Sequence, residues 1–93
     1  MRTSVQLLRS YLDDLGFSER DYGIGHDAER QDVDNRHCLI GEGDQWIVYY
    51  SERGSRWDEM TFDSEKVACM FMLGLFTQKY VERWPRHGDG RTP

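Results

Sequence analysis

The sequence predicts an α+β fold, a two-layer sandwich with an antiparallel sheet of three to four strands and the N- and C-terminal helices on one face. Two observations predict it. Apolar residues recur at helical spacing near both ends of the chain, and the middle holds β-favouring runs separated by glycine turns. The 93 residues suit a single domain, expected at 1–85, with a flexible tail at 86–93 after Trp84-Pro85 stops the last helix.

The first helix is predicted between Thr3 or Ser4, either of which can cap its start, and Gly16, which can end it. Its apolar stripe recurs in steps of three and four residues at Val5, Leu8, Leu12 and Leu15. The stretch 17–35 is less regular. Tyr22 to Ile24 forms a candidate fourth strand, and the polar segment after it is an exposed loop or a weak edge strand.

Three strands are expected at 36–40, 46–51 and 56–62, joined by turns at 41–44 and 52–55. The near-continuous apolar run from Trp46 to Ser51 indicates either that both of its faces are partly covered or that one face presents aromatic residues to a partner. In the last strand, simple alternation places Met60 and Phe62 on one side and Trp57 on the other. The sheet face away from the helices is expected to be open to solvent or to a partner.

The second helix is predicted over 64–83, with Asp63 as its N-cap and Glu65 in its first turn. It is apolar nearly all round, which is typical of a helix buried on more than one side. The second side is expected to meet either the first helix or another subunit. Gly74, in mid-helix, costs about 1 kcal/mol relative to alanine, so we expect it to permit close packing.

The formal net charge is −5, and the acidic residues are unevenly spread. Residues 13–44 contain ten acidic residues and three arginines, a net charge of −7. Such a surface does not favour nucleic acid or anionic lipid, and it fits a partner with a basic surface. The longest apolar run is far shorter than a membrane span, and the N-terminus lacks a signal-peptide core, so a cytoplasmic protein is expected.

Known catalytic and metal-binding patterns do not match the sequence. Cys38 and Cys69 are expected to be buried, reduced thiols, and adjacent His37 and Cys38 should point to opposite faces of a strand. The histidines and cysteines have no zinc-site spacing, and Asp32-Val33-Asp34-Asn35 starts like a calcium loop without completing it. We therefore expect no catalytic residue, no cofactor, no metal and no enzyme activity.

One stretch resembles a known group. The run Trp46-Ile47-Val48-Tyr49-Tyr50-Ser51-Glu52-Arg53-Gly54, followed by Phe62-Asp63-Ser64-Glu65 and Ala68, looks like small immunity proteins of bacterial polymorphic toxin and contact-dependent inhibition systems. The resemblance covers residues 46–76. It implies a cytoplasmic inhibitor that binds and neutralises a cognate toxin domain, often a nuclease or an NAD-consuming enzyme.

The acidic stretch and nearby exposed aromatic residues are the predicted contact surface, because an acidic inhibitor is steered to a basic toxin cleft. The candidate partner-binding residues are Asp21, Tyr22, Asp27, Glu29, Asp32, Asp34, Glu42, Asp44, Glu52, Arg53 and Trp57. The alternative is a homodimeric adaptor or regulatory module that self-associates through its apolar C-terminal helix.

Overall fold

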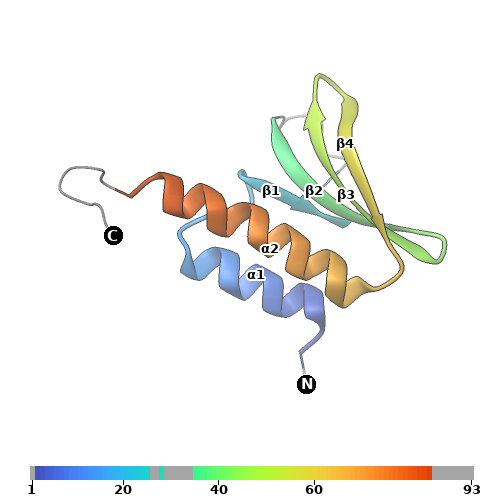
Figure 1. Ribbon diagram of the computed structural model, residues 1–93, viewed down its shortest axis with the longest axis horizontal. Helices are drawn as coiled ribbons and strands as arrows, with labels where there is room; N and C mark the ends of the chain where they lie inside the picture. Colours follow the sequence, from blue (N-terminus) through green and yellow to red (C-terminus); the bar gives the residue numbers. More distant parts are fainter. Residues whose placement is uncertain (1, 26–27, 29–34, 85–93) are drawn as a thin grey trace.

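Two helices lie on one side of a four-stranded sheet in the computed structural model, which describes residues 2–25, 28 and 35–84 (Figure 1). Helix α2 (Glu65–Glu82) crosses the sheet, and α1 (Ser4–Asp14) packs beside it. The predicted α+β class and the helices at the two ends of the fold are therefore confirmed. The expected tail at 86–93 lies outside the described residues.

Helix α1 begins and ends with the predicted chemistry. The Thr3 hydroxyl accepts a hydrogen bond from the Gln6 backbone N–H, and the Gln6 side chain accepts one from the Thr3 N–H, which completes a capping box. At the other end, Gly16 has φ +91° and Phe17 donates its N–H to the Leu12 carbonyl at 2.9 Å. This Schellman motif turns Phe17 back into the core beside Leu12.

The strands follow the chain in the order β1 (Tyr22–Ile24), β2 (Arg36–Glu42), β3 (Gln45–Glu52) and β4 (Ser55–Phe62). The pairs β2–β3 and β3–β4 are antiparallel, as expected, but β1 runs parallel to β2, so the sheet is mixed. The fully antiparallel sheet was therefore wrong for the fourth strand. Parallel neighbours cannot be joined as a hairpin, so β1 and β2 do not form one.

Helix α2 is capped by Ser64, whose hydroxyl accepts from the Val67 N–H at 3.2 Å, and not by Asp63 as predicted. Ser64 has the extended backbone of an N-cap, so the preceding aspartate lies one residue too early. The Glu65 carboxylate accepts a hydrogen bond from the Val5 N–H at 3.4 Å, which links the first turns of the two helices.

The main core lies between the helices and the sheet. Phe76 is 1% exposed, and its ring centroid lies 5.0 Å from that of Phe17 and 6.2 Å from that of Tyr22. The buried cluster is completed by Leu8, Leu12, Ile24, Leu39, Val48, Ala68, Cys69 and Met72. Both helices thus contribute to the same core.

The other sheet face is covered over β2 and β3, which contradicts the expectation that it is open there, whereas Thr61 of β4 stays exposed on it. Cys38, Ile40, Ile47 and Tyr49 are all buried there, together with Ala28 from the segment between β1 and β2. A Cβ on Gly23 would lie 2.7 Å from the Ala28 Cα, so glycine is required where Ala28 packs against β1. Arg56 stacks over the Tyr49 ring at 4.8 Å and forms a 3.0 Å ion pair with Glu42.

Arg36 is the buried charged residue of β2, with 1% exposure. Its guanidinium donates to the carbonyl oxygens of Tyr22 at 3.2 Å and Glu19 at 3.3 Å. These bonds attach β2 to β1 and to the turn that precedes β1. The arginine that the sequence presents as a counter-charge to the acidic stretch is thus a structural residue.

Candidate functional site

A groove lies between α2 and the helix-side face of the β3–β4 hairpin. It has a volume of about 340 Å³ and receives residues from β2, β3, β4 and α2. Its lining residues are His37, Val48, Asp58, Glu59, Met60, Phe71 and Leu75. Figure 1 shows how the hairpin rises away from α2 toward its turn, while the end of β4 remains close to the start of the helix.

A β-bulge in β4 determines which side chains face this groove. Val48 pairs with Met60 and Tyr50 pairs with Trp57, so Asp58 and Glu59 together lie opposite the single residue Tyr49. Asp58 has φ +55°, a left-handed conformation that aspartate tolerates better than most residues. The bulge therefore shifts the side-chain alternation by one residue in the middle of the strand.

This shift corrects the predicted facing of Trp57. Directly paired residues share a sheet face, and Tyr50 lies on the helix side, where its ring is 5.0 Å from that of His37. Trp57 therefore lies on the same face as Met60 and Phe62, not on the opposite face. Simple alternation failed because a bulge adds a residue to one strand only.

Two large apolar side chains stay exposed on this face of the hairpin. Trp57 is 55% exposed and Met60 is 47% exposed, although Phe62, further along the strand, packs against the core. Tryptophan is strongly enriched among the residues that dominate binding energy in protein interfaces, and methionine adapts to irregular partner surfaces. The exposed pair gives the groove an apolar side suited to a protein partner.

His37 lines the groove from β2. Its ring lies 6.0 Å from that of Phe76, and its Nδ1 is buried without a hydrogen-bond partner among the described residues. Burial lowers the pKa of His37, the positive charge of Lys79 lowers it further, and Asp58 opposes the shift. His37 is therefore neutral at pH 7 and acts as an aromatic part of the groove wall.

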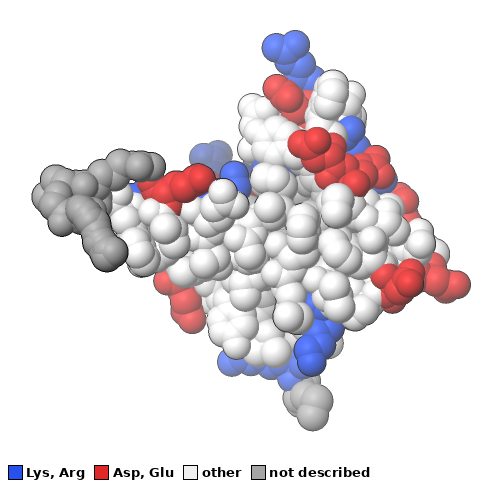
Figure 2. All heavy atoms as spheres, viewed as in Figure 1, with Lys and Arg blue, Asp and Glu red and all other residues white. Residues whose placement is uncertain are grey.

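Acidic side chains lie next to the apolar ones. Asp58 and Glu59, the two bulge residues, both line the groove. Figure 2 shows acidic atoms along the β3–β4 hairpin, with basic atoms at its tip and edge, whereas the surface over the two helices is mainly uncharged. The groove thus combines an apolar contact area with negative charge.

The predicted contact residues do not form one continuous surface in the structure. Tyr22 is 4% exposed and belongs to the core, so the expectation that it is an exposed aromatic was wrong. Asp21 accepts the Ser18 N–H at 2.7 Å and stabilises the turn before β1. Glu42 and Asp44 lie at the β2–β3 turn, where Glu42 is paired with Arg56.

Glu52, Arg53 and Trp57 do lie near one another, at the turn between β3 and β4 and on the strand that follows it. Arg53 has φ +53°, as one residue of this tight turn. The other predicted acidic contacts, Asp27, Glu29, Asp32 and Asp34, lie outside the described residues. Of the predicted set, Trp57 is therefore the residue beside the groove.

Four residues that line the groove are not among the contact residues predicted from the sequence: His37, Asp58, Glu59 and Met60. One signal was available: an Asp-Glu pair in the middle of a strand is unusual, because aspartate disfavours extended structure and tolerates positive φ. Such a pair between Trp57 and Met60 can indicate a bulge. No comparable signal distinguishes His37 from an ordinary strand residue.

Metal binding, thiol chemistry and membrane insertion were each checked among the described residues. They contain no group of three or more His, Cys, Asp or Glu side chains placed to hold a metal ion. Both cysteines are free and buried, as predicted, and burial raises the pKa of Cys38 and brings that of Cys69 to about 11. Within the same part of the chain, no helix is long and apolar enough to cross a bilayer.

Comparison with known proteins does not assign the chain to a family. No protein-family model matches it, and no match was found among curated proteins or among solved structures.

Proposed function

We propose that this protein acts by binding another protein through the groove between α2 and the β3–β4 hairpin. The partner that we propose is a toxin domain of the kind implied by the resemblance over residues 46–76, which the protein neutralises by contact. The proposal includes no catalytic step on this chain.

The exposure of Trp57 and Met60 on one face, beside the carboxylates of Asp58 and Glu59, is the observation that supports the proposal most strongly. Burying the indole and thioether supplies binding energy, because each removes a large apolar area from water. The carboxylates favour approach of a basic surface and contribute mainly to the association rate.

The centre of the proposed contact lies on the β3–β4 hairpin and not in the acidic stretch 13–44. Within the acidic stretch 13–44, Tyr22 is in the core and Asp21 and Glu42 have local partners. The hairpin therefore supplies the apolar centre. Asp27, Glu29, Asp32 and Asp34 remain proposed outer contacts, to be tested by charge reversal of all four.

Co-purification with the products of the adjacent genes identifies the partner, and titration then measures its affinity. We expect Trp57→Ala to weaken binding at least tenfold, the effect of losing about 1.4 kcal/mol or more at an interface hot spot. Trp84→Ala is the matched control, since Trp84 is 53% exposed at the far end of α2. Met60→Ala, compared with Met70→Ala, provides a second matched pair.

The two tryptophan variants show whether weakened binding comes from the groove or from the loss of any exposed tryptophan. Equal affinities for Trp57→Ala and the unmodified protein, with weakened binding by Trp84→Ala, would move the contact away from the groove. Toxicity assays in cells that express the partner test the functional part separately: a bound but fully active partner excludes neutralisation.

A further inference from the structure

The side of α2 that faces away from the sheet is apolar and uncovered. Met70 is 62% exposed, Val67 49% and Val81 44%, and these residues share one side of the helix with Gly74. This surface, which we call the outer face of α2, lies opposite the side that carries Met72 and Phe76 into the core. It is separate from the groove on the hairpin.

Gly74 has no packing role within the described chain. A Cβ built on it would meet no atom within 4 Å, so the close packing expected at Gly74 does not occur within the described residues. Glycine at an exposed mid-helix position costs about 1 kcal/mol of stability relative to alanine. The same residue lets a second helix approach the backbone closely.

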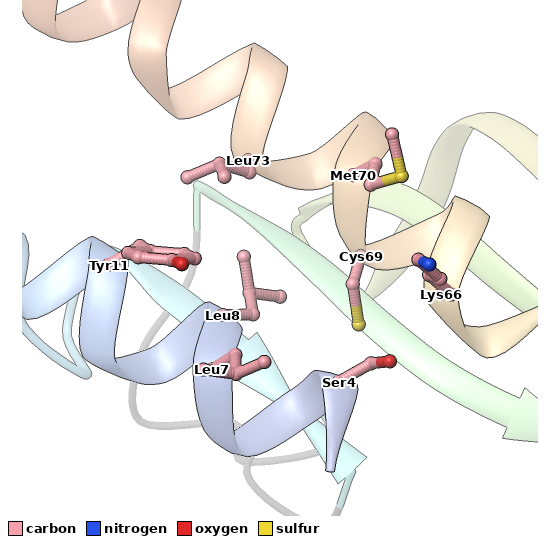
Figure 3. Close-up of a pocket in the computed structure, with 8 residues that line it drawn as sticks. All are labelled: Ser4, Leu7, Leu8, Tyr11, Lys66, Cys69, Met70 and Leu73. Carbon is pink, nitrogen blue, oxygen red and sulfur yellow. The ribbon is translucent and has the colours of Figure 1, made fainter. Parts of the chain in front are cut away.

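An apolar groove continues the outer face toward α1 (Figure 3). Leu7 and Tyr11 of α1 face Met70 and Leu73 of α2 across it, with Cys69 and Leu8 between them. Leu7 and Tyr11 are themselves exposed. The uncovered apolar area therefore spans both helices.

The arrangement of residues around Gly74 is self-complementary. Val67 and Val81 lie seven residues before and after it, and Lys66 and Glu82 lie eight residues before and after it. In an antiparallel pair of identical helices that cross at Gly74, each Lys66 approaches Glu82 of the second copy.

The charged pair also suits the commonest helix-packing geometry. Lys66, Met70, Gly74, Gln78 and Glu82 recur at intervals of four and form one ridge along the helix surface. When two such ridges pack side by side in opposite directions, the basic end of one meets the acidic end of the other. Lys66 and Glu82 are both exposed, and the Glu82 carboxylate accepts one hydrogen bond from the Gln78 side chain at 3.3 Å, which leaves its other oxygen to face Lys66 of the second copy.

From these observations we infer that the protein forms a symmetric homodimer in which α2 packs antiparallel to α2 of a second copy, with Gly74 at the crossing. One surface supplies both halves of the contact, as a two-fold interface requires. The inference does not depend on the proposed toxin-binding function, because none of the observations behind it involves the residues that line the hairpin groove.

Sedimentation equilibrium at micromolar concentrations tests the dimer with two charge-reversal variants. Lys66→Glu and Glu82→Lys each place like charges at both symmetric contacts, so each alone should weaken dimerisation about fivefold or more. An equimolar mixture of the two variants restores opposite charges at both contacts. We therefore expect the mixture to form a heterodimer about as stable as the unmodified dimer.

The double variant Lys66→Glu/Glu82→Lys should dimerise with itself for the same reason. Arg53→Glu, which changes charge by the same amount as Lys66→Glu but lies at the β3–β4 turn, should leave dimerisation unchanged. A monomeric unmodified protein overturns the inference. So does a dimer whose two single variants, once mixed, show no gain over either variant alone.

Discussion

The two sides of α2 are similar in sequence but different in structure. The inner side places Ala68, Met72 and Phe76 at no more than 1% exposure against the sheet, whereas the outer face leaves Val67, Met70 and Val81 in solvent. Both sides are apolar, so hydrophobic content alone does not say which one builds the core. The difference shows that part of this apolar surface is not needed for folding of the single chain.

Phe76→Ala should produce the largest effect, a loss of about 3–5 kcal/mol in the free energy of unfolding, because it removes the ring that contacts Phe17 and Tyr22. Met70→Ala, on the outer face, should change the monomer's stability by less than about 0.5 kcal/mol. Urea denaturation at low protein concentration measures both. Comparable losses in the two variants would contradict the division of α2 into a core side and a free side.

Gly74→Ala tests the outer face with a smaller expected effect. It should stabilise the monomer by up to about 1 kcal/mol, since the new methyl group meets no atom and alanine favours the helix. The same methyl group should weaken self-association by keeping the crossing helices apart. Thermal denaturation and sedimentation of one sample measure the two changes, and a destabilised monomer would show that the glycine is needed within the chain.

The smallest effect concerns His37, which lies beside the inner side of α2. Because its pKa is lowered in the folded protein, the unfolded chain takes up the proton first as the pH falls. The stability contributed by neutral His37 is complete above about pH 6.5 and is lost as the pH falls below that value. Urea denaturation from pH 7.5 to 5.5 should show a shallower pH dependence for His37→Gln than for the unmodified protein, and equal slopes would contradict this.

The parts of the fold that were predictable from the sequence are those fixed by contacts between residues close in the chain. The ends of α1 follow from Thr3, Gln6 and Gly16, whose hydrogen bonds involve residues close in sequence. The antiparallel strands follow from β-favouring runs and the turns between them. The parallel pairing of β1 was missed because Tyr22–Ile24 is three residues long and its partner strand begins twelve residues later.

The candidate site was less predictable because it depends on register. Sequence alternation cannot show that Asp58 and Glu59 share one position opposite Tyr49, and this bulge decides that Trp57 and Met60 lie on one face. Cover on the second sheet face was also missed. Ala28 stands in a polar stretch of sequence without apolar periodicity, and the stacking of Arg56 over Tyr49 depends on the register of β3 and β4.

Methyl NMR of the methionine side chains tests the central claim, that the hairpin groove and the outer face of α2 are separate interaction surfaces. Met60 reports on the groove, Met70 on the outer face and Met72 on the core. Addition of the partner should shift the Met60 signal and leave Met70 unchanged, whereas an increase in protein concentration should shift Met70 and leave Met60 unchanged. A partner that shifts Met70 alone, or dilution that moves Met60, would contradict the assignment of the two surfaces.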